Sequence, residues 1–183
     1  MYHIKDNARI KESAALIVDG LFRCLEKKDF VELTITEVHK EATVGRATFY
    51  RLFDNLTDVL AYQSDLMFQN LFEDMTWQEN TDYKGNFMHF ISYWMEQRIL
   101  LAAIINSNHL EILYGSHKRC ALTITESITN SRNGMTETQN AYFRCIQSSV
   151  MIGVLLMWFQ RGQKETAEEL FEIAEKSTLH YSV

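Results

Sequence analysis

Hydrophobic residues recur every three or four positions from the start of the chain, which is the period of an amphipathic helix. The first stripe predicts a helix over residues 7–28, and its apolar members are Ile10, Ala14, Ile17, Leu21 and Leu25. A shorter stripe, made by Ile35, Val38 and Ala42, predicts a second helix over residues 35–41. We expect the first helix to cover the inner side of the segment that contains the second.

The second helix has a clear start signal and ends at a turn. Thr34 and Glu37 form a T-x-x-E capping box, in which each side chain satisfies a backbone N–H that is free at the helix start. Thr43-Val44-Gly45 then interrupts the pattern, and glycine tolerates the backbone angles of a turn. With a further short helix over residues 46–52, this arrangement predicts a helix-turn-helix.

The helix over residues 46–52 has two contrasting sides on a helical wheel. The inner side consists of Thr48, Phe49, Leu52 and Phe53, and the outer side of Arg46, Ala47, Tyr50 and Arg51. Arginine can bind guanine or phosphate, and tyrosine can reach phosphate or a thymine methyl group. The outer side therefore suits close approach to DNA, although spacing alone fits a helical hairpin with a solvated basic end equally well.

The segment from Ala42 to Phe53, ATVGRATFYRLF, resembles the recognition segment of the TetR/AcrR family of bacterial transcription regulators. That family's pattern reads roughly A-G-V-S-x-G-T-F/L-Y-x-H-F. Residues 9–34 also resemble the family's first helix, so the resemblance covers about sixty residues. It implies an all-α protein with an N-terminal three-helix DNA-binding domain and a C-terminal helical domain for ligand binding and dimerisation. It also implies repression that a small molecule relieves.

Three residues depart from the family pattern. Thr43 replaces the usual turn glycine, so the turn either finds an ordinary backbone conformation or is slightly strained. Leu52 replaces a common histidine and Leu56 a common lysine, both of which typically contact phosphate in the family. Their absence predicts weaker sequence-independent DNA affinity, because each neutralised phosphate adds to counterion release. Candidates to compensate are Lys5, Arg9, Lys11 and Lys40.

We therefore predict a DNA-binding transcriptional regulator that acts as a repressor, binds a palindromic double-stranded DNA operator as a homodimer and is released by an unknown small-molecule effector. The predicted DNA-binding residues are Thr34, Thr36, Arg46, Ala47, Thr48, Tyr50 and Arg51. The two threonines are expected to hold phosphate at a helix N-terminus. The alternative, which Leu52 and Leu56 favour, is a relative with weakened DNA contact that works as a co-regulator through a protein partner.

The DNA-binding domain is predicted at residues 1–54 and the ligand-binding and dimerisation domain at residues 55–183. A helix over residues 55–75 is expected to begin against the first domain and end in the second. After a polar loop, a helix over residues 87–105 carries His89, Tyr93 and Trp94, which are candidate ligand contacts. The alternative, which the sequence favours, is a core helix with a satisfied histidine.

Two short helices, over residues 109–114 and 117–129, are predicted on either side of Gly115-Ser116. They contain three residues that often bind metals, namely His109, His117 and Cys120. No nearby carboxylate at helical spacing completes a set of four ligands, or of three with an open position. We therefore predict neither a metal site nor a cofactor.

After a loop at residues 131–134, a capping box at Thr136 and Gln139 predicts a long helix over residues 136–161, ended by Gly162. Its second half is apolar on all sides and must be covered on all sides. A last helix begins at Thr166. We expect these two helices to pair with the same two of a second subunit, through Val150, Val154, Met157, Trp158, Leu170, Phe171 and Ala174. The alternative is a monomer whose core absorbs both helices.

Composition narrows the class of protein. Of 183 residues, 46% are hydrophobic, 12% are aromatic and none is proline, which excludes a disordered chain and favours an all-α fold. The net charge is −6, and the first sixty residues carry nine Lys and Arg against ten Asp and Glu. The chain is therefore no polybasic nucleic-acid binder, and any DNA contact must come from the local placement of cations.

Three widely spaced cysteines without a C-x-x-C motif indicate a reduced, cytoplasmic protein. The first residues lack the apolar core of a signal peptide, and the most apolar run, residues 150–159, is shorter than the roughly 20 residues of a membrane span. We therefore expect no membrane association and a buried helix at that run. No G-x-S-x-G, H-E-x-x-H or phosphate-binding glycine loop is present, so we predict that the protein is not an enzyme.

Overall fold

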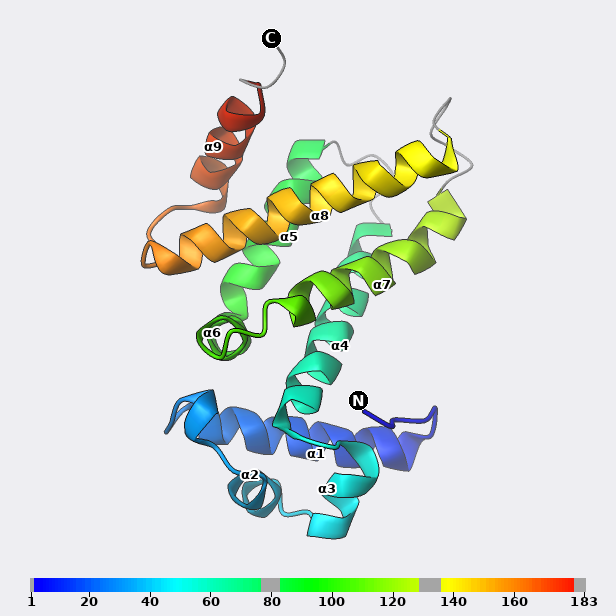
Figure 1. Cartoon of the computed structure of the whole chain (residues 1–183), viewed down its shortest axis with the longest axis vertical. Helices are drawn as coiled ribbons and strands as arrows, with labels where there is room; N and C mark the ends of the chain where they lie inside the picture. The colour runs from blue at the N-terminus through cyan, green and yellow to red at the C-terminus, as the bar shows by residue number, and fades with distance from the viewer. Residues whose placement is uncertain (1, 77–82, 129–135, 180–183) are drawn as a thin grey trace. The chain divides into compact units, whose positions relative to one another are not determined.

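The computed structural model describes residues 2–76, 83–128 and 136–179, and every regular element in those ranges is a helix (Figure 1). The all-α prediction is therefore confirmed. The helices are α1 (Ala8–Leu25), the 3-10 turn η1 (Phe30–Glu32), α2 (Ile35–Glu41), α3 (Arg46–Leu52), α4 (Leu56–Thr76), α5 (Tyr83–Glu96), α6 (Arg98–Asn106), α7 (Glu111–Ile128), α8 (Glu137–Gln160) and α9 (Ala167–Leu179).

The chain divides into two compact units that are discontinuous in sequence. The first unit contains Met1–Met67 and Ile99–Leu113, and the second contains Phe68–Arg98 and Tyr114–Val183. Both α4 and α7 therefore contribute residues to each unit. The predicted domains, divided after residue 54, differ from these units because residues 55–67 and 99–113 group with the N-terminal helices.

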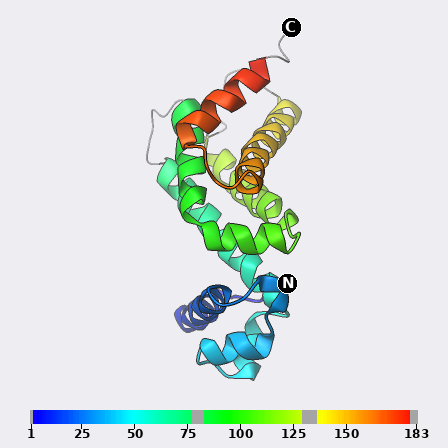
Figure 2. The ribbon, with the colours of Figure 1, turned by 90° about the vertical axis from the view of Figure 1, so that its left-hand side faces the viewer.

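In the first unit, α1 packs on α2 and α3, and α2 packs on α3 (Figures 1 and 2). Gly20 lets α1 approach α2 closely, because a Cβ atom at this position would lie 2.6 Å from Cβ of Ala42. The interior of this three-helix arrangement is apolar and consists of Ala14, Ile17, Leu21, Val38, Ala42, Phe49, Leu52 and Phe53. The predicted helical stripes and the predicted bounds of α2 and α3 are thus confirmed.

The predicted single helix over residues 87–105 is wrong, because α5 ends at Glu96 and α6 begins at Arg98. Neither proline nor glycine causes the break. The N–H of Gln97 donates to the carbonyl of Trp94 at 3.1 Å, and Nε of Arg98 donates to the carbonyl of Met95 at 3.1 Å. These bonds satisfy carbonyls at the end of α5 and thereby cap the helix.

The predicted break at Gly115-Ser116 is also wrong, because α7 runs without interruption from Glu111 to Ile128. Ser116 and His117 are buried, so packing holds this segment helical despite the low helix propensity of glycine. The loop predicted at residues 131–134 lies outside the described residues.

In the second unit, α5 packs against α8 and α9, and α8 packs against α9. Phe87 meets Phe171 at 5.4 Å between ring centroids, and the indole N–H of Trp158 donates to the carbonyl of Glu165 at 3.0 Å. The capping box at Thr136 is present, and Thr166 makes the same reciprocal bonds with Glu169. Both predicted helix starts are therefore confirmed.

Among the described residues, α8 is the one helix long and apolar enough to cross a membrane by length and composition alone. Within residues 150–159, Met151, Ile152, Leu155 and Trp158 are buried, whereas Met157 is 55% exposed. The predicted buried helix is therefore confirmed for one side of α8, and the single chain does not cover it on all sides.

Candidate nucleic-acid interface

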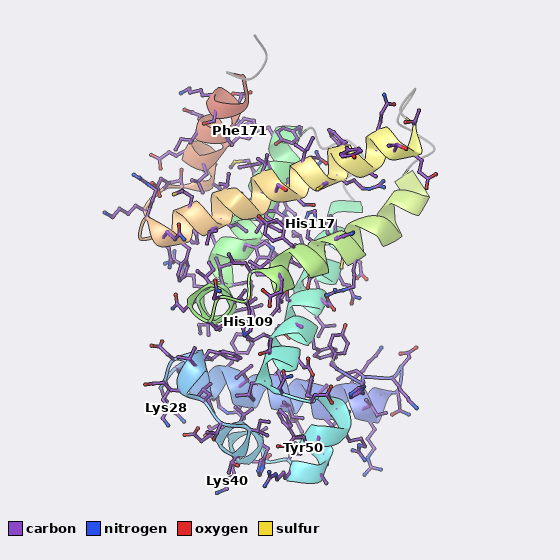
Figure 3. All side chains as sticks on the ribbon, in the orientation of Figure 1. Lys28, Lys40, Tyr50, His109, His117 and Phe171 are labelled. Carbon is purple, nitrogen blue, oxygen red and sulfur yellow. The ribbon has the colours of Figure 1, made fainter. Side chains whose placement is uncertain are left out.

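The two sides of α3 differ in burial as the helical wheel predicts. Phe49 and Leu52 are 0% and 1% exposed and face the core, whereas the ring of Tyr50 is 43% exposed. The other predicted contact residues of this helix are exposed, apart from Thr48, which is half-buried; they are Arg46, Ala47 and Arg51. Figure 3 shows Tyr50 on α3 and Lys40 on the neighbouring α2 of the same unit.

The cations of the first unit fall into two groups. Several pair with carboxylates: Arg23 and Lys27 with Glu41, Lys28 with Glu37, and Lys11 with Asp6. By contrast, Arg46, Arg51 and the exposed Lys40 have no carboxylate partner in the part of the chain that the structure describes. The guanidinium of Arg46 lies over the Tyr50 ring, 5.5 Å from its centroid, which orients both side chains. The exposed side of α3 therefore presents charge that no nearby acid neutralises.

The turn before α3 holds Thr43 in the left-handed region, with φ at 55°. Its N–H donates to the carbonyl of Lys40, and the N–H of Val44 donates to the carbonyl of His39, both at 3.0 Å. This is a Schellman motif, in which the left-handed position normally carries glycine. The strained alternative for Thr43 is thus the one the structure adopts.

Thr34 caps α2 through the predicted box, and the cap competes with its predicted phosphate contact. Both the N–H and the hydroxyl of Thr34 donate to Oε2 of Glu37, at 2.9 and 2.8 Å. Bonds from Lys28 and Thr34 lower the pKa of Glu37 to about 2, so the carboxylate is ionised at neutral pH. An anion at this helix start would meet a negative charge, whereas Thr36, the second residue of α2, is exposed.

The two leucines that replace family cations point inward. Leu52 is 1% exposed and Leu56 is 8% exposed. They therefore contribute packing to the core, and a histidine or lysine side chain in their orientation would be buried. Neither position supplies a phosphate-binding cation in this chain, and the weaker DNA affinity expected from their presence stays a prediction.

The N-terminal segment supports α3 in a way that the sequence does not reveal. The N–H of His3 donates to the carbonyl of Leu52 at 2.8 Å, and its ring lies 3.0 Å from Asp54. The hydroxyl of Tyr2 donates to the buried carboxylate of Asp65 at 2.6 Å. No motif in residues 2–7 predicts these contacts, which hold the segment against the end of α3 and the start of α4.

Comparison with known proteins complements this geometry. No family model and no curated protein matches the sequence. The crystal structure of Lin0861 from Listeria innocua is similar with a TM-score of 0.77 at 17% identity, covering 98% of this chain and 96% of that chain. A TetR transcriptional regulator from Streptococcus agalactiae 2603V is similar with a TM-score of 0.60 at 18% identity, covering 91% and 93%.

The chain has the TetR fold. At these identities the similarity establishes the fold alone.

In the second unit, the three predicted ligand residues differ in burial and in hydrogen bonding. Trp94 is fully buried, with its ring 4.9 Å from Phe68 between centroids, and its Nε1 has no hydrogen-bond partner. His89 and Tyr93 are half-buried; Nε2 of His89 is unpartnered, and burial raises the pKa of Tyr93. A cleft of about 380 Å³ lies instead between α7 and α8, and none of the three residues lines it.

The residues predicted to form a dimer interface divide into two groups by their burial in the single chain. Four are buried within the single chain, namely Trp158, Leu170, Phe171 and Ala174. Val150 and Val154 are half-buried, and Met157 is 55% exposed. The apolar side chains that the chain leaves exposed on these helices are Tyr142, Ile146, Met157 and Ile173. Ile173 on α9 is 54% exposed and points to solvent.

The three residues considered for a metal lie in different surroundings. His109, in the first unit, has its Nδ1 3.0 Å from Oε1 of Glu111 and its ring edge-on to Phe30. His117 and Cys120 are buried in the second unit. Among the described residues, no three His, Cys, Asp or Glu side chains are placed to hold a metal ion.

His117 occupies an aromatic surrounding. Its ring centroid lies 5.4–5.9 Å from those of Phe72, Phe68 and Phe90 (Figure 3). The hydroxyl of Ser148 donates to the carbonyl of Arg144 at 2.9 Å, so its oxygen accepts from Nδ1 of His117 at 2.7 Å. Burial lowers the pKa of His117 to about 4, and the ring is neutral at pH 7.

Proposed function

We propose that this protein is a DNA-binding transcriptional regulator that binds a palindromic operator as a homodimer and is released by a small-molecule effector, acting as a repressor. The observation that carries the proposal is the exposed side of α3, where Arg46, Tyr50 and Arg51 lack carboxylate partners within the described residues. A structurally similar protein from Streptococcus agalactiae is described as a TetR transcriptional regulator.

Each side chain on this surface has a distinct role in the proposal. Arg46 and Arg51 bind base edges or phosphate, Tyr50 binds phosphate or a thymine methyl group, and Ala47 allows close approach. The half-buried Thr48 contributes at the edge of the same surface. Thr36 and the unpaired Lys40 add phosphate contacts from α2. Thr34 acts mainly as a helix cap, because Glu37 already binds its donors.

Dimerisation follows from the apolar surface that α8 leaves exposed. Tyr142, Ile146 and Met157 are 69%, 61% and 55% exposed and lie on one side of α8. A patch of this kind marks a protein interface. In a two-fold dimer, two α3 helices about 34–36 Å apart would contact successive turns of one DNA face and so read an inverted repeat.

Effector release needs a route from the second unit to α3. Both α4 and α7 run through both units, so neither unit can shift these helices without involving the other. Within the first unit, Nε2 of His109 lies 3.4 Å from the hydroxyl of Thr57 on α4. We infer that an effector acts through α4, α7 and this contact, and that it shifts the equilibrium only by its differential affinity for two arrangements.

The alternative, a co-regulator that works through a protein partner, depends on Leu52 and Leu56 as lost phosphate contacts. Both side chains lie in the core, so neither position supplies such a contact. The exposed side of α3 nevertheless favours direct DNA binding.

The test begins with selection of bound duplexes from a random DNA library, followed by affinity measurements across a salt series. We expect an inverted repeat, a steep salt dependence, and at least a tenfold loss of affinity for Arg46→Ala combined with Tyr50→Phe. The matched control is Arg161→Ala, which removes an exposed arginine of the second unit. Unchanged operator affinity in the double variant would show that the assigned surface is wrong.

A further inference from the structure

We propose that the cleft between α7 and α8 binds a small amphipathic anion, a molecule that carries a carboxylate or similar oxyanion on an apolar tail. The cleft volume of about 380 Å³ lies within the range of small-molecule pockets. Its lining residues are Tyr114 and Lys118 from α7, with Ala141, Arg144, Cys145, Ser148 and Ser149 from α8. This site differs from the candidate ligand contacts on α5, which are His89, Tyr93 and Trp94.

Charge is the first reason for an anion. Lys118 lies on one wall of the cleft and Arg144 on the other, and neither has a carboxylate partner among the residues that the structure describes. Several other cations of the same unit are already engaged, namely Arg161 with Glu165, Lys176 with Glu172, Arg98 over Trp158 and Lys84 over Phe171, and the exposed Lys164 lies outside the cleft. In a chain with a net charge of −6, two cations facing one concavity create a local site for an oxyanion.

The two serine hydroxyl groups that line the cleft already donate hydrogen bonds within α8. Ser149 donates to the carbonyl of Cys145 at 2.9 Å, and Ser148 donates to the carbonyl of Arg144. Both serine protons are therefore already used within α8. The donors left for a ligand head group are those of Lys118, Arg144 and the Tyr114 hydroxyl, and these groups fix where the head group lies.

The remainder of the lining suits an apolar tail. Ala141, the Tyr114 ring and the Cys145 thiol offer apolar surface, and the aliphatic stems of Lys118 and Arg144 extend it. His117 lies behind Ser148 and is neutral at pH 7, so it adds no charge to the site. A small inorganic anion would use the cations but leave this apolar surface unfilled.

The cleft is separate from the proposed dimer surface. At about 100° per residue, the cleft residues of α8 and the exposed residues Tyr142, Ile146 and Met157 are centred roughly 130° apart around the helix. The cleft side is continuous with the buried residues Ile152 and Leu155. A ligand and a second subunit can therefore bind α8 at the same time.

Titration calorimetry on the full chain tests the site with octanoate, octyl phosphate, octylamine and 1-octanol as probes. We expect octanoate or octyl phosphate to bind at least tenfold more tightly than 1-octanol and octylamine, and the comparison of the two anions identifies the preferred head group. Arg144→Gln and Lys118→Gln should each weaken anion binding about tenfold or more, whereas Lys164→Gln, an exposed cation outside the cleft, should not. Equal affinity for 1-octanol and octanoate, or unchanged binding in both cleft variants, would overturn the proposal.

Cys145 gives an independent readout of where the probe binds. Its thiol is exposed and lines the cleft, while Cys24 and Cys120 are buried. Saturating octanoate should slow the reaction of Cys145 with a thiol reagent several-fold in the wild type and have no effect at the same concentration in Arg144→Gln. Octanoate binding that leaves the Cys145 rate unchanged would place the ligand elsewhere and contradict the assignment.

A regulatory role for this anion rests on the proposed function, whereas binding does not. Lys118 and Tyr114 lie on α7 within two turns of Glu111, the residue that pairs with His109 in the first unit. The octanoate-bound protein should therefore show lower operator affinity than the free protein. Unchanged operator affinity would overturn the regulatory link. An absence of any selected operator would overturn the proposed function. Calorimetry tests separately whether the cleft binds an amphipathic anion.

Discussion

At the residue scale, Thr43 has a left-handed backbone conformation that is unfavourable for a β-branched side chain. It adopts φ of 55° at the C-terminal end of α2, where a β-branched residue costs about 1–2 kcal/mol and glycine costs almost nothing. We predict that Thr43→Gly raises the free energy of unfolding by about 0.5–1 kcal/mol, measured by urea denaturation. Thr36→Gly, the same change in the first turn of α2, should instead lower it by roughly 0.3–0.5 kcal/mol. A loss of stability at Thr43 would mean that the turn is not strained.

The buried His117 should make the free energy of unfolding depend on pH. The pKa of His117 is about 4 in the folded chain and near the ordinary histidine value of 6.5 in the unfolded chain, so between these pH values the unfolded state binds more protons. The free energy of unfolding should therefore fall as pH falls through this window, by about 3 kcal/mol in all from this residue.

Urea denaturation of the wild type and His117→Gln from pH 7 to pH 4 isolates this contribution, because the two proteins share every other titrating group. The difference in free energy of unfolding between them should shrink as the pH falls. A His117 imidazole that titrates near pH 6.5 by NMR would contradict the prediction.

At the residue scale, the sequence predicts which side chains of α3 face outward because a helix of seven residues has one amphipathic solution. The wheel also places Leu52 inside, but it does not predict that Leu56, the first residue of α4, is buried where a related pattern has a cation. Burial at Leu56 depends on how α3 and α4 meet, and no local spacing encodes that. The support of α3 by Tyr2 and His3 is equally hidden, because it joins residues far apart in sequence.

At the element scale, α8 carries an exposed apolar side that predicts an interface. We expect Met157→Asp to weaken self-association at least tenfold in sedimentation velocity, because a charge would be buried against the partner. Ile99→Asp is the matched control, since Ile99 is an exposed apolar residue of α6 in the other unit. Self-association that survives Met157→Asp, or that Ile99→Asp disrupts equally, would move the interface away from α8.

Helix starts are predicted well from the sequence, and helix interruptions are not. The boxes at Thr34, Thr136 and Thr166 are local hydrogen-bond patterns and appear as expected. The break at Gln97 and the continuity of α7 through Gly115 depend instead on tertiary packing. For the same reason, the cleft between α7 and α8 could not be found from sequence, because its walls are brought together only by folding.

At the scale of the whole molecule, the all-α class follows from periodicity, and the proposed DNA-binding residues come from a resemblance over the first sixty residues and stay a prediction. The grouping of residues 99–113 with the N-terminal helices does not follow, because it is a contact between distant segments. The hydrophobic pattern predicts that α6 has an apolar side. It does not predict which unit covers that side.

This discontinuous first unit sets a rule for building hybrid proteins. A hybrid that joins residues 1–54 to another protein's C-terminal domain would leave behind residues 55–67 and 99–113, which belong to the same compact unit. An exchange that respects the unit must insert the new segments between residues 67 and 99 and after residue 113. Over evolution, the same constraint ties the α6 segment to helices α1, α2 and α3, so the two should change together while the second unit diverges.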